Sequence, residues 1–357
     1  MSPVPVTLSR HILEEGQRRA DIAGELSTLI AQLGFTAKTL SREMRRAALI
    51  GELGLVGDRN ATGDAQKKLD VYSNETMVEA FKATGLVSAV ASEELEEIQY
   101  IQCGGEGRYI LCTDPLDGSS NTDINGSLGT IFGFYRRKQR VGSPTQEEVL
   151  RPGAELVLAG YVLYSTSTML VYSAGHGVHG FTLDADLGEF LLSHRDMRCP
   201  RHGGTFSANV GRYRDWPQGV QDYLSYVTIV DKPSGRPYSH RYSGALVGDV
   251  HRILLEGGIY FYPQDSSHKE GKIRLVYECA PLSFIAEQAG GMASSVGERI
   301  LDMQPRAVHH RCPFAIGSAE EVALRPLRHR QGRSGTGLKT DSSNFFCRCR
   351  IPTAGDG

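Results

Sequence analysis

Apolar residues recur at helical spacing in the first part of the chain, between residues 9 and 50, as at Ile12, Leu26 and Leu33. This spacing places apolar side chains on one face of a helix, and three glycines interrupt it, so it predicts two or three helices. A further helical run, Ser73 to Ala83, begins with residues that cap helices and ends before a glycine. It leads into a short apolar stretch, Val87 to Ala91, which we predict to be a strand.

The pattern changes between Tyr109 and Leu192, where six short aromatic or branched runs are separated by turn residues: YILCT, GTIFGFY, LVLAGYVLYS, TMLVYSA, GFTLD and EFLL. Such runs are typical of a mostly antiparallel sheet. After Cys199-Pro200, the helical runs LVGDVHRILLEGG and IRLVYECAPLSFIAEQAGG alternate with the strand-like IYFY and PFAIG. The sequence therefore predicts an α/β fold of the layered α+β type, with a second subdomain from about residue 200.

The end of the chain differs in composition. From about Arg328 it is rich in Gly, Ser, Thr and Arg and has no sustained periodicity. Segments of this kind bury too little apolar surface to order themselves. We expect residues 328–357 to be a disordered tail.

Composition and charge narrow the class of protein. The chain has 39 basic and 41 acidic residues, a balance that argues against a dedicated nucleic-acid binder. It contains no apolar run of membrane-spanning length, and two glutamates appear before a signal-peptide core could form. Seven cysteines without a C-x-x-C pair indicate reduced thiols. We expect a soluble, cytoplasmic protein without a membrane partner.

The stretch CTDPLDGSSN, residues 112–121, carries the first candidate chemistry. It follows the strand-like YILCT, so Asp114 and Asp117 lie where a strand ends and the chain turns. An ordinary turn stabilised by aspartate is one explanation, because these residue types are common in turns. Small residues after Asp117 also leave backbone N–H groups available for a phosphate, and two carboxylates with the Leu116 carbonyl suit Mg²⁺ or Mn²⁺ better than zinc.

Other charged segments are individually ambiguous. Glu93 and Glu94 follow the predicted strand, and Asp64 and Asp70 flank two lysines in a stretch that we read as a loop. Exposed acids at a helix start would explain the first pair. In GKIRLVYE, residues 271–278, the arginine and the final glutamate are four apart, as in a surface ion pair on a helix.

Taken together in this order, the segments resemble the fructose-1,6-bisphosphatase family, within the lithium-sensitive, magnesium-dependent sugar and inositol phosphatases. The resemblance runs from about Leu8 to Ala323. The segments that carry it are TGDAQKKLD, SEE, DPLDGSSN, GTIFGFYRRK, RYSGALVGDVHR, GGIYFYP and GKIRLVYE. It implies alternating helix and sheet layers in two subdomains, residues 1–198 and 199–327, with the active site between them.

The resemblance also implies how the 1-phosphate of fructose 1,6-bisphosphate is hydrolysed in gluconeogenesis. Two or three Mg²⁺ ions, or Mn²⁺ in their place, would be held by six ligands: Asp64, Glu93, Asp114, the Leu116 carbonyl, Asp117 and Glu278. Divalent ions are what would keep so many neighbouring carboxylates ionised. Glu94, coupled to Asp70, resembles the pair that accepts the proton of the attacking water. Gly118, Ser119 and Ser120 would hold the phosphoryl group.

At the other end of the substrate, the 6-phosphate needs fixed positive charge and hydroxyl donors. The residues that match the family's substrate-binding positions are Asn209, Arg241, Tyr242, Gly244, Tyr262, Lys272 and Arg274. The resemblance implies that Arg241 reaches in from a neighbouring subunit of a homotetramer. The chain reads Val210-Gly211-Arg212 where the family has Glu-Gly-Tyr, and Ala245-Leu246 where it has Ser-Met. These departures bear on substrate affinity.

An allosteric AMP pocket is implied by a second group of residues: Ala23, Gly24, Glu25, Leu26, Ser27, Arg108, Tyr109 and Arg136. The family has Thr-Gly-Glu where this chain has Ala23-Gly24-Glu25, and lysine at Arg108, so AMP sensitivity is expected to be altered. The cysteine-bearing insertion of the plastid form is absent between Lys138 and Leu158, and we expect no thioredoxin-type switch.

Two other functions stay open on the sequence alone. The same chemistry could act on sedoheptulose 1,7-bisphosphate, or the chain could be a non-enzymatic protein that binds sugar phosphate or AMP. The segment GHGVHG, residues 175–180, formally fits a dinucleotide-binding fingerprint, but the strand-like FTLD follows it, so we predict a tight hairpin.

Overall fold

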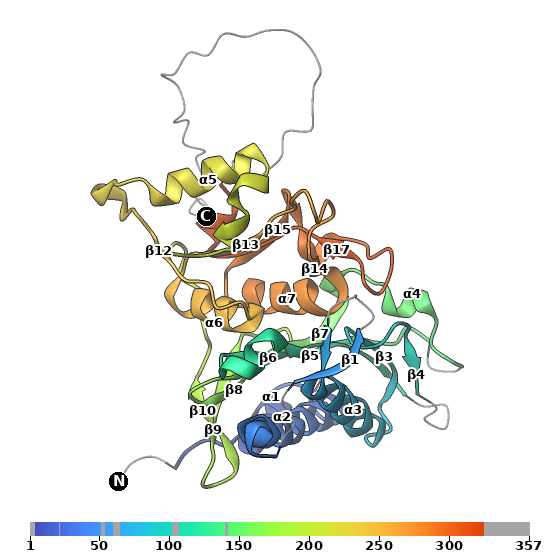
Figure 1. The fold of residues 1–357 in the computed structure, drawn as a ribbon. Helices are drawn as coiled ribbons and strands as arrows, with labels where there is room; N and C mark the ends of the chain where they lie inside the picture. The colour runs from blue at the N-terminus through green and yellow to red at the C-terminus, as the bar shows by residue number, and fades with distance from the viewer. Residues whose placement is uncertain are drawn as a thin grey trace, which may run out of the picture.

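Helices and sheets alternate through the molecule in five layers (Figure 1). The computed structural model describes residues 4–20, 22–50, 54–59, 65–101, 107–139 and 142–324. Three helices cover one face of an eight-stranded sheet, and two central helices fill the space between it and a second, six-stranded sheet. The remaining helices cover the outer face of that second sheet. The predicted layered α/β class is confirmed.

The first layer consists of α1 (Leu8–Arg18), α2 (Glu25–Ile50) and α3 (Lys68–Lys82). The prediction of two or three helices before residue 50 is met by two, because Gly34 does not interrupt α2. A Cβ at Gly34 would lie 2.6 Å from the Leu8 side chain, so this glycine lets α1 approach α2 closely. Helix α3 begins five residues before the predicted Ser73, since the Asp70 carboxylate accepts a hydrogen bond from the Lys67 N–H and caps it there.

The eight-stranded sheet has the order β10-β9-β8-β7-β6-β5-β3-β4. Its strands are β3 (Val87–Ser92), β4 (Gln99–Tyr100), β5 (Tyr109–Asp117), β6 (Leu128–Arg136), β7 (Leu156–Tyr164), β8 (Thr168–Ser173), β9 (His179–Asp184) and β10 (Glu189–His194). Every neighbouring pair is antiparallel except β3 and β5, which run parallel. The predicted, mostly antiparallel sheet is confirmed, and GHGVHG is the hairpin between β8 and β9.

The second sheet has the order β12-β11-β13-β18-β15-β16. Its strands are β11 (Thr205–Ser207), β12 (Ser239–His240), β13 (Ile259–Tyr262), β15 (Met292–Ser295), β16 (Glu298–Arg299) and β18 (Phe314–Gly317). The helices that flank it are α6 (Leu246–Glu256) and α7 (Ala280–Gln288) on the inner side, and α5 (Gln218–Thr228) and α8 (Ala319–Val322) on the outer side.

Several short elements complete the fold. Strands β1 (Leu55–Arg59) and β2 (Ala65–Lys67) pair with each other, as do β14 (Ile273–Arg274) and β17 (Arg311–Cys312). The run that we predicted as one helix from Ile273 therefore begins as a strand, continues in a π-helical turn, η5 (Leu275–Cys279), and only then becomes α7. The short helix α4 is Gln146–Val149.

Within the described part of the chain, no helix is both long and apolar enough to span a membrane. The tail that we predicted at residues 328–357 lies outside the described residues.

Candidate active site

Strand β5 carries the first two carboxylates of the site and continues further than predicted. The turn was expected directly after YILCT, but β5 extends to Asp117 and pairs with β6 over its whole length. The pairing register shifts between Asp114 and Asp117, which marks a β-bulge. Leu116 is thus part of a strand and not of the turn, and the chain turns at Gly118, whose φ is 77°.

Asp117 links this strand to a helix more than a hundred residues away in the chain. Its two carboxylate oxygens accept hydrogen bonds from the backbone N–H groups of Leu246 (3.1 Å) and Val247 (2.7 Å). These N–H groups belong to the first turn of α6, where backbone N–H groups have no acceptor within the helix. They also lie at the positive end of the helix dipole. Burial raises the pKa of Asp117 to about 7, while the two N–H donors act against that shift.

Glu93 and Glu278 meet at Arg274. The Arg274 guanidinium lies 2.6 Å from a Glu93 carboxylate oxygen and 3.7 Å from one of Glu278. Glu278 also accepts a hydrogen bond from the Arg274 backbone N–H at 2.6 Å. All three side chains are buried, so this is not the surface pair that helical spacing alone would suggest.

Negative charge exceeds positive charge in this cluster of Glu93, Asp114, Asp117, Glu278 and Arg274. Burial raises the pKa of Asp114 well above its usual range, and the charges of the three other carboxylates raise it further, opposed by Arg274. Burial likewise raises the pKa of Glu278. Four buried carboxylates beside one guanidinium leave an excess that a cation would balance.

The donor chemistry of the cluster fits a hard divalent ion, because every ligand it offers is an oxygen. Among the described residues, however, no three His, Cys, Asp or Glu side chains are already grouped tightly enough to hold one ion. Arg274 lies between two of the carboxylates. Asp64, the remaining predicted ligand, lies outside the described residues.

Asp70 and Glu94 lie beside this cluster. Asp70 is buried, and its Oδ1 atom has no hydrogen-bond partner, while Oδ2 accepts from the Lys67 N–H at 2.7 Å. Burial raises the pKa of Asp70 to about 7, the Lys67 N–H acts against this, and the Glu94 charge adds to it. Glu94 accepts a hydrogen bond from the Gln66 side chain at 2.6 Å. The two carboxyl groups are therefore electrostatically coupled, as expected for a shared proton.

The turn after β5 forms the 3-10 helix η1 (Ser119–Ile124). Gly118 approaches α6 so closely that a Cβ would lie 2.6 Å from the Ala245 side chain. Ser119 is half-buried and Ser120 exposed, and Ser119 contributes a hydrogen bond that acts against the raised pKa of Asp70. The predicted phosphate-binding turn therefore adjoins the predicted proton acceptor.

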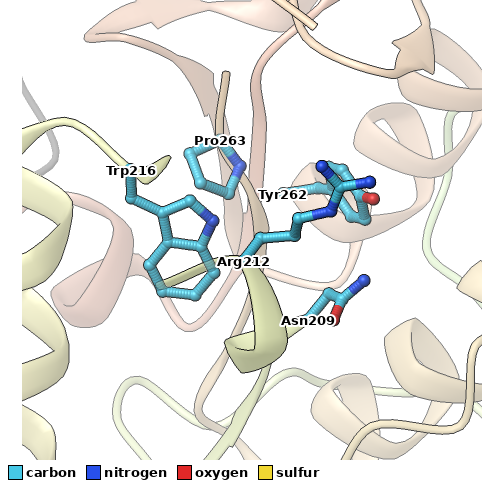
Figure 2. A pocket seen from close by; sticks show the side chains of 5 residues that line it. All are labelled: Asn209, Arg212, Trp216, Tyr262 and Pro263. Atoms are coloured by element: carbon cyan, nitrogen blue, oxygen red, sulfur yellow. The ribbon is translucent and has the colours of Figure 1, made fainter. Parts of the chain in front are cut away.

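The substrate-binding residues predicted for the far phosphate gather at β13. Asn209 and Tyr262 line one hollow together with Arg212, Trp216 and Pro263 (Figure 2). Lys272 Nζ lies 6.0 Å from the centre of the Tyr262 ring. Partial burial raises the pKa of Tyr242 to about 12, and the charges of Tyr262, Asp249 and Asp117 add to this shift.

Arg241 is placed differently. Its side chain is exposed and donates a hydrogen bond to the carbonyl of its neighbour His240 at 2.8 Å. It is not among the residues that line the hollow. Gly244, with a φ of 81°, lies in the loop that leads from Arg241 into α6.

Two family models together match most of the chain. One, described as "Fructose-1-6-bisphosphatase, N-terminal domain", matches residues 6–195, and the other, its "C-terminal domain", matches residues 199–327. The chain belongs to the fructose-1,6-bisphosphatase family.

Relatives within this family cover almost the whole chain. A class 1 fructose-1,6-bisphosphatase of Acaryochloris marina is 54% identical over 330 residues, which are 92% of this chain and 99% of that protein. One from Chloroherpeton thalassium is 47% identical over 89% of this chain and 92% of its own length. The crystal structure of Leishmania major fructose-1,6-bisphosphatase in holo form superposes with a TM-score of 0.83 at 39% identity, covering 90% of this chain and 97% of that one. Sedoheptulose bisphosphate hydrolysis and a non-enzymatic role gain no support.

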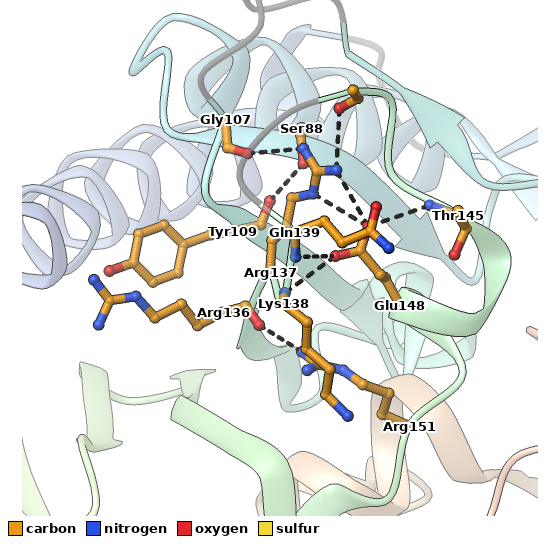
Figure 3. A network of polar contacts seen from close by, with 11 residues as sticks. Ser88, Gly107, Tyr109, Arg136, Arg137, Lys138, Gln139, Thr145, Glu148 and Arg151 are labelled. Carbon is orange, nitrogen blue, oxygen red and sulfur yellow. Dashed lines mark hydrogen bonds and ion pairs between the residues drawn. The ribbon is translucent and has the colours of Figure 1, made fainter.

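The predicted AMP residues of this fructose-1,6-bisphosphatase family member come together at the start of α2. Arg108 forms an ion pair of 2.7 Å with Glu25, and the Tyr109 hydroxyl donates to the same carboxylate at 3.2 Å. Arg136 faces Tyr109 across the β5–β6 pair (Figure 3). Of the helix-start residues, Ala23 and Gly24 are exposed, Ser27 is half-buried, and Leu26 belongs to the core.

The next residue after Arg136 fixes this end of the sheet. The buried Arg137 side chain donates two hydrogen bonds to Glu148, which also accepts from the backbone N–H groups of Lys138, Gln139 and Thr145 (Figure 3). One carboxylate thus binds the backbone N–H groups of residues from both described sides of the connection that follows β6, Lys138 and Gln139 on one side and Thr145 on the other.

Sequence reasoning missed some residues that shape the site. The stretch that we read as a loop contains β2 and the start of α3. Lys67 in this stretch donates hydrogen bonds to Thr122 and Asp123 at 2.8 Å each, which ties the start of α3 to the predicted phosphate-binding turn. The K-K-L-D spacing of a helix cap could have revealed the helix start. His309, which follows η5 in the chain, bonds through both ring nitrogens, to Tyr277 and to the Leu95 carbonyl.

Proposed function

We propose that the protein hydrolyses the 1-phosphate of fructose 1,6-bisphosphate at the cluster of Glu93, Asp114, Asp117 and Glu278. The products are fructose 6-phosphate and inorganic phosphate. Family membership supports the activity. The observation that carries the assignment of the site is the excess of buried carboxylates next to a phosphate-binding turn and a coupled proton acceptor.

The proposed cofactor is Mg²⁺, two or three ions in each subunit, with Mn²⁺ able to substitute. Asp64, Glu93, Asp114, the Leu116 carbonyl, Asp117 and Glu278 would hold them. When bound, such ions polarise phosphoryl oxygens and lower the pKa of a bound water. In this assignment the Arg274 guanidinium balances part of the negative charge of the carboxylates, which would otherwise repel one another.

The residues of the chain supply the remaining steps. The Asp70–Glu94 pair accepts the proton of the attacking water, because one buried carboxyl of the pair titrates near neutral pH. Backbone N–H groups from Gly118 to Ser120 and the two serine hydroxyls orient the transferring phosphoryl group. In-line attack then needs only that water and phosphorus stay aligned while the bond to the sugar oxygen breaks.

The far phosphate is bound at the β13 side. Asn209, Tyr242 and Tyr262 donate hydrogen bonds to it, and Lys272 supplies charge. Arg241 supplies further charge from a neighbouring subunit of a homotetramer, in keeping with its exposed side chain outside the hollow. Arg274 and Gly244 shape the space around the sugar. The proposed compartment is the cytoplasm.

AMP is the proposed effector at the start of α2. The N–H groups of Gly24, Glu25 and Leu26 at the helix start would bind its phosphate, with Ser27, Arg108, Tyr109 and Arg136 around it. The Glu25–Arg108 ion pair would have to open for this to happen. Weaker inhibition than in relatives with lysine and threonine at these positions is expected.

Phosphate release from fructose 1,6-bisphosphate tests the proposal directly. We expect release with Mg²⁺, none with a chelator, and a loss of at least about a hundredfold in kcat for Asp114→Asn, because the substitution removes a ligand charge. The matched control is Asp302→Asn, which changes an exposed aspartate paired with Arg299. Equal rates for Asp114→Asn and the unmodified protein would refute the assignment of the cluster.

A further inference from the structure

Arg212 is a cation in the hollow that no step above uses. It lies in the 3-10 helix η3 (Val210–Asp215), which starts directly after Asn209. Asn209, Arg212, Trp216, Tyr262 and Pro263 line this open, shallow hollow (Figure 2). The hollow therefore places one guanidinium beside two residues predicted to bind the far phosphate.

The Arg212 charge is not neutralised by a carboxylate. Among the described residues it forms no ion pair, and its one side-chain hydrogen bond, at 3.3 Å, goes to the neutral hydroxyl of Ser267. The side chain is nevertheless half-buried and lies between Trp216 and the Tyr262 side of the hollow (Figure 2). A half-buried guanidinium with unused donors is suited to bind an anion.

The surroundings of Arg212 favour an anion of high charge. Lys272, whose ammonium lies 6.0 Å from the Tyr262 ring centre, is a second cation on the same tyrosine. The Asn209 amide and the Tyr262 hydroxyl are neutral donors of residues that line the same hollow. A phosphate dianion has enough charge and acceptor oxygens to use both cations and both donors, whereas a sugar hydroxyl carries no charge.

The backbone of η3 holds Arg212 in position. Trp216, which ends this helix, is buried and packs edge-on against Phe261 of β13, with ring centres 5.6 Å apart. The Arg212 N–H donates to the Asn209 carbonyl at 3.1 Å. The backbone that carries the guanidinium is therefore anchored before any ligand binds.

We infer that Arg212 binds the 6-phosphate of the substrate from within the same subunit. This inference rests on the proposed function and adds to it a specificity-determining residue. Where the family resemblance supplies the charge through Arg241 of a neighbouring subunit, this chain has a second arginine that needs no neighbour. Its position is one where the family has a tyrosine.

A charge of this kind acts on the ground state and the transition state alike, since the 6-phosphate does not change during the reaction. Its removal raises KM and leaves kcat nearly unchanged. It also has no effect on a substrate that lacks the 6-phosphate. These two properties separate a phosphate-binding role from a merely structural one.

The test compares Arg212→Gln, Arg212→Lys and the control Arg214→Gln, which changes an exposed arginine on the same turn. We expect Arg212→Gln to raise KM for fructose 1,6-bisphosphate by about tenfold or more, with kcat within about twofold. Arg212→Lys should restore part of the affinity. With fructose 1-phosphate as substrate, kcat/KM should be the same in all four proteins.

Calorimetric binding of fructose 6-phosphate, measured without catalysis, keeps this inference separate from the proposed function. Tenfold weaker binding to Arg212→Gln supports the role of Arg212 even if no hydrolysis is seen, in which case the proposed function alone fails. Unchanged binding and KM in Arg212→Gln would overturn the inference, as would an equal loss of kcat/KM on fructose 1-phosphate.

Discussion

Single buried carboxyl groups dominate the chemistry of this protein. Asp70, Asp114, Asp117 and Glu278 are all buried, and burial is the largest cause of the raised pKa of each. Such groups cost free energy unless a cation, an N–H group or a proton compensates them. Arg274 acts against the shift of both Asp114 and Glu278, two N–H groups of α6 act against that of Asp117, and the Lys67 N–H acts against that of Asp70.

The pH dependence of the rate follows from Asp70. Burial raises the pKa of Asp70 to about 7, so the carboxylate that we propose as the proton acceptor is depleted as the pH falls. We expect kcat to be about tenfold lower at pH 6 than at pH 8, and this dependence to disappear in Asp70→Asn together with most of the activity. The control is Glu79→Gln, an exposed acid on the same helix. An unchanged pH profile in Asp70→Asn would contradict the role.

When a chelator has removed metal ions, the stability of the protein should fall as the pH rises, whereas the rate of the reaction should increase. A carboxyl group whose pKa is raised from 3.8 to about 7 on folding stabilises the native state below pH 3.8, and this contribution is lost as the pH rises through 7. At pH 8 in a chelator, Asp70→Asn is therefore expected to melt above the unmodified protein. A lower melting temperature there would show that the Asp70 carboxylate contributes more through its hydrogen bond to Lys67 than its burial costs.

For single residues of the candidate site, the sequence predicted which residues take part but not which residues they contact. Asp114 and Asp117 could be predicted as neighbours, since they lie three apart in one motif. The bonds from Asp117 to Leu246 and Val247 could not, because they join residues about 130 positions apart and depend on packing between β5 and α6. Arg212 was seen only as a departure from the family, without its hollow.

Among the elements, α1 depends on an uncharged histidine. His11 is buried against Phe181, Tyr172 and His179, and neither ring nitrogen has a hydrogen-bond partner. Burial lowers its pKa to about 4, and the His179 and Arg195 charges add to this, whereas Glu14 and Glu15 act against it. Helix α1 therefore packs on the sheet with the neutral form of His11.

Acid should weaken the packing of α1 on the sheet, and His11→Phe should prevent part of the resulting loss of stability. The unfolded chain binds a proton near pH 6.5 and the native one near pH 4, so stability falls as the pH drops through that window. Between pH 7 and pH 4.5, the free energy of unfolding, measured with urea, should fall by about 1–2 kcal/mol less in His11→Phe than in the unmodified protein. His202→Gln, at an exposed position, is the control. An equal loss of stability in His11→Phe and in the unmodified protein would refute the role of His11 in acid sensitivity.

Long periodic elements were predicted well and short ones poorly. The strands of the large sheet and helix α6 follow runs whose apolar pattern is set by burial. By contrast, β11, β12 and β16 have two or three residues each, too few for any period, and α5 was not predicted. Its face is defined by contacts with Phe206 and Phe261, which only the tertiary structure reveals.

Across the whole molecule, the site joins the two halves that the family models delimit. Glu93 and Asp117 precede residue 195, and their partners Arg274, Leu246 and Val247 follow residue 199. An ion held by carboxylates from both halves would bind only when the halves are docked. Its binding free energy would then add to the stability of the entire molecule.

Divalent cations should therefore raise the melting temperature of the protein in a single transition. At an Mg²⁺ concentration of about 100 times Kd, the added stability is about 2.7 kcal/mol. We expect calorimetry to show this upward shift, Asp114→Asn to abolish it, and Asp302→Asn to retain it. Two transitions, of which only one responds to Mg²⁺, would contradict a site shared by both halves.

The parallel pairing of β3 and β5 has one more consequence. In a sheet that is otherwise antiparallel, this is the one pair of neighbouring described strands whose carboxyl ends lie at the same edge, and Glu93 follows one end while Asp117 closes the other. Adding or removing one residue in β3 would move its end by about 3.3 Å and reverse the side on which each following side chain points. The ends of the two strands are therefore fixed by the positions that Glu93 and Asp117 must take.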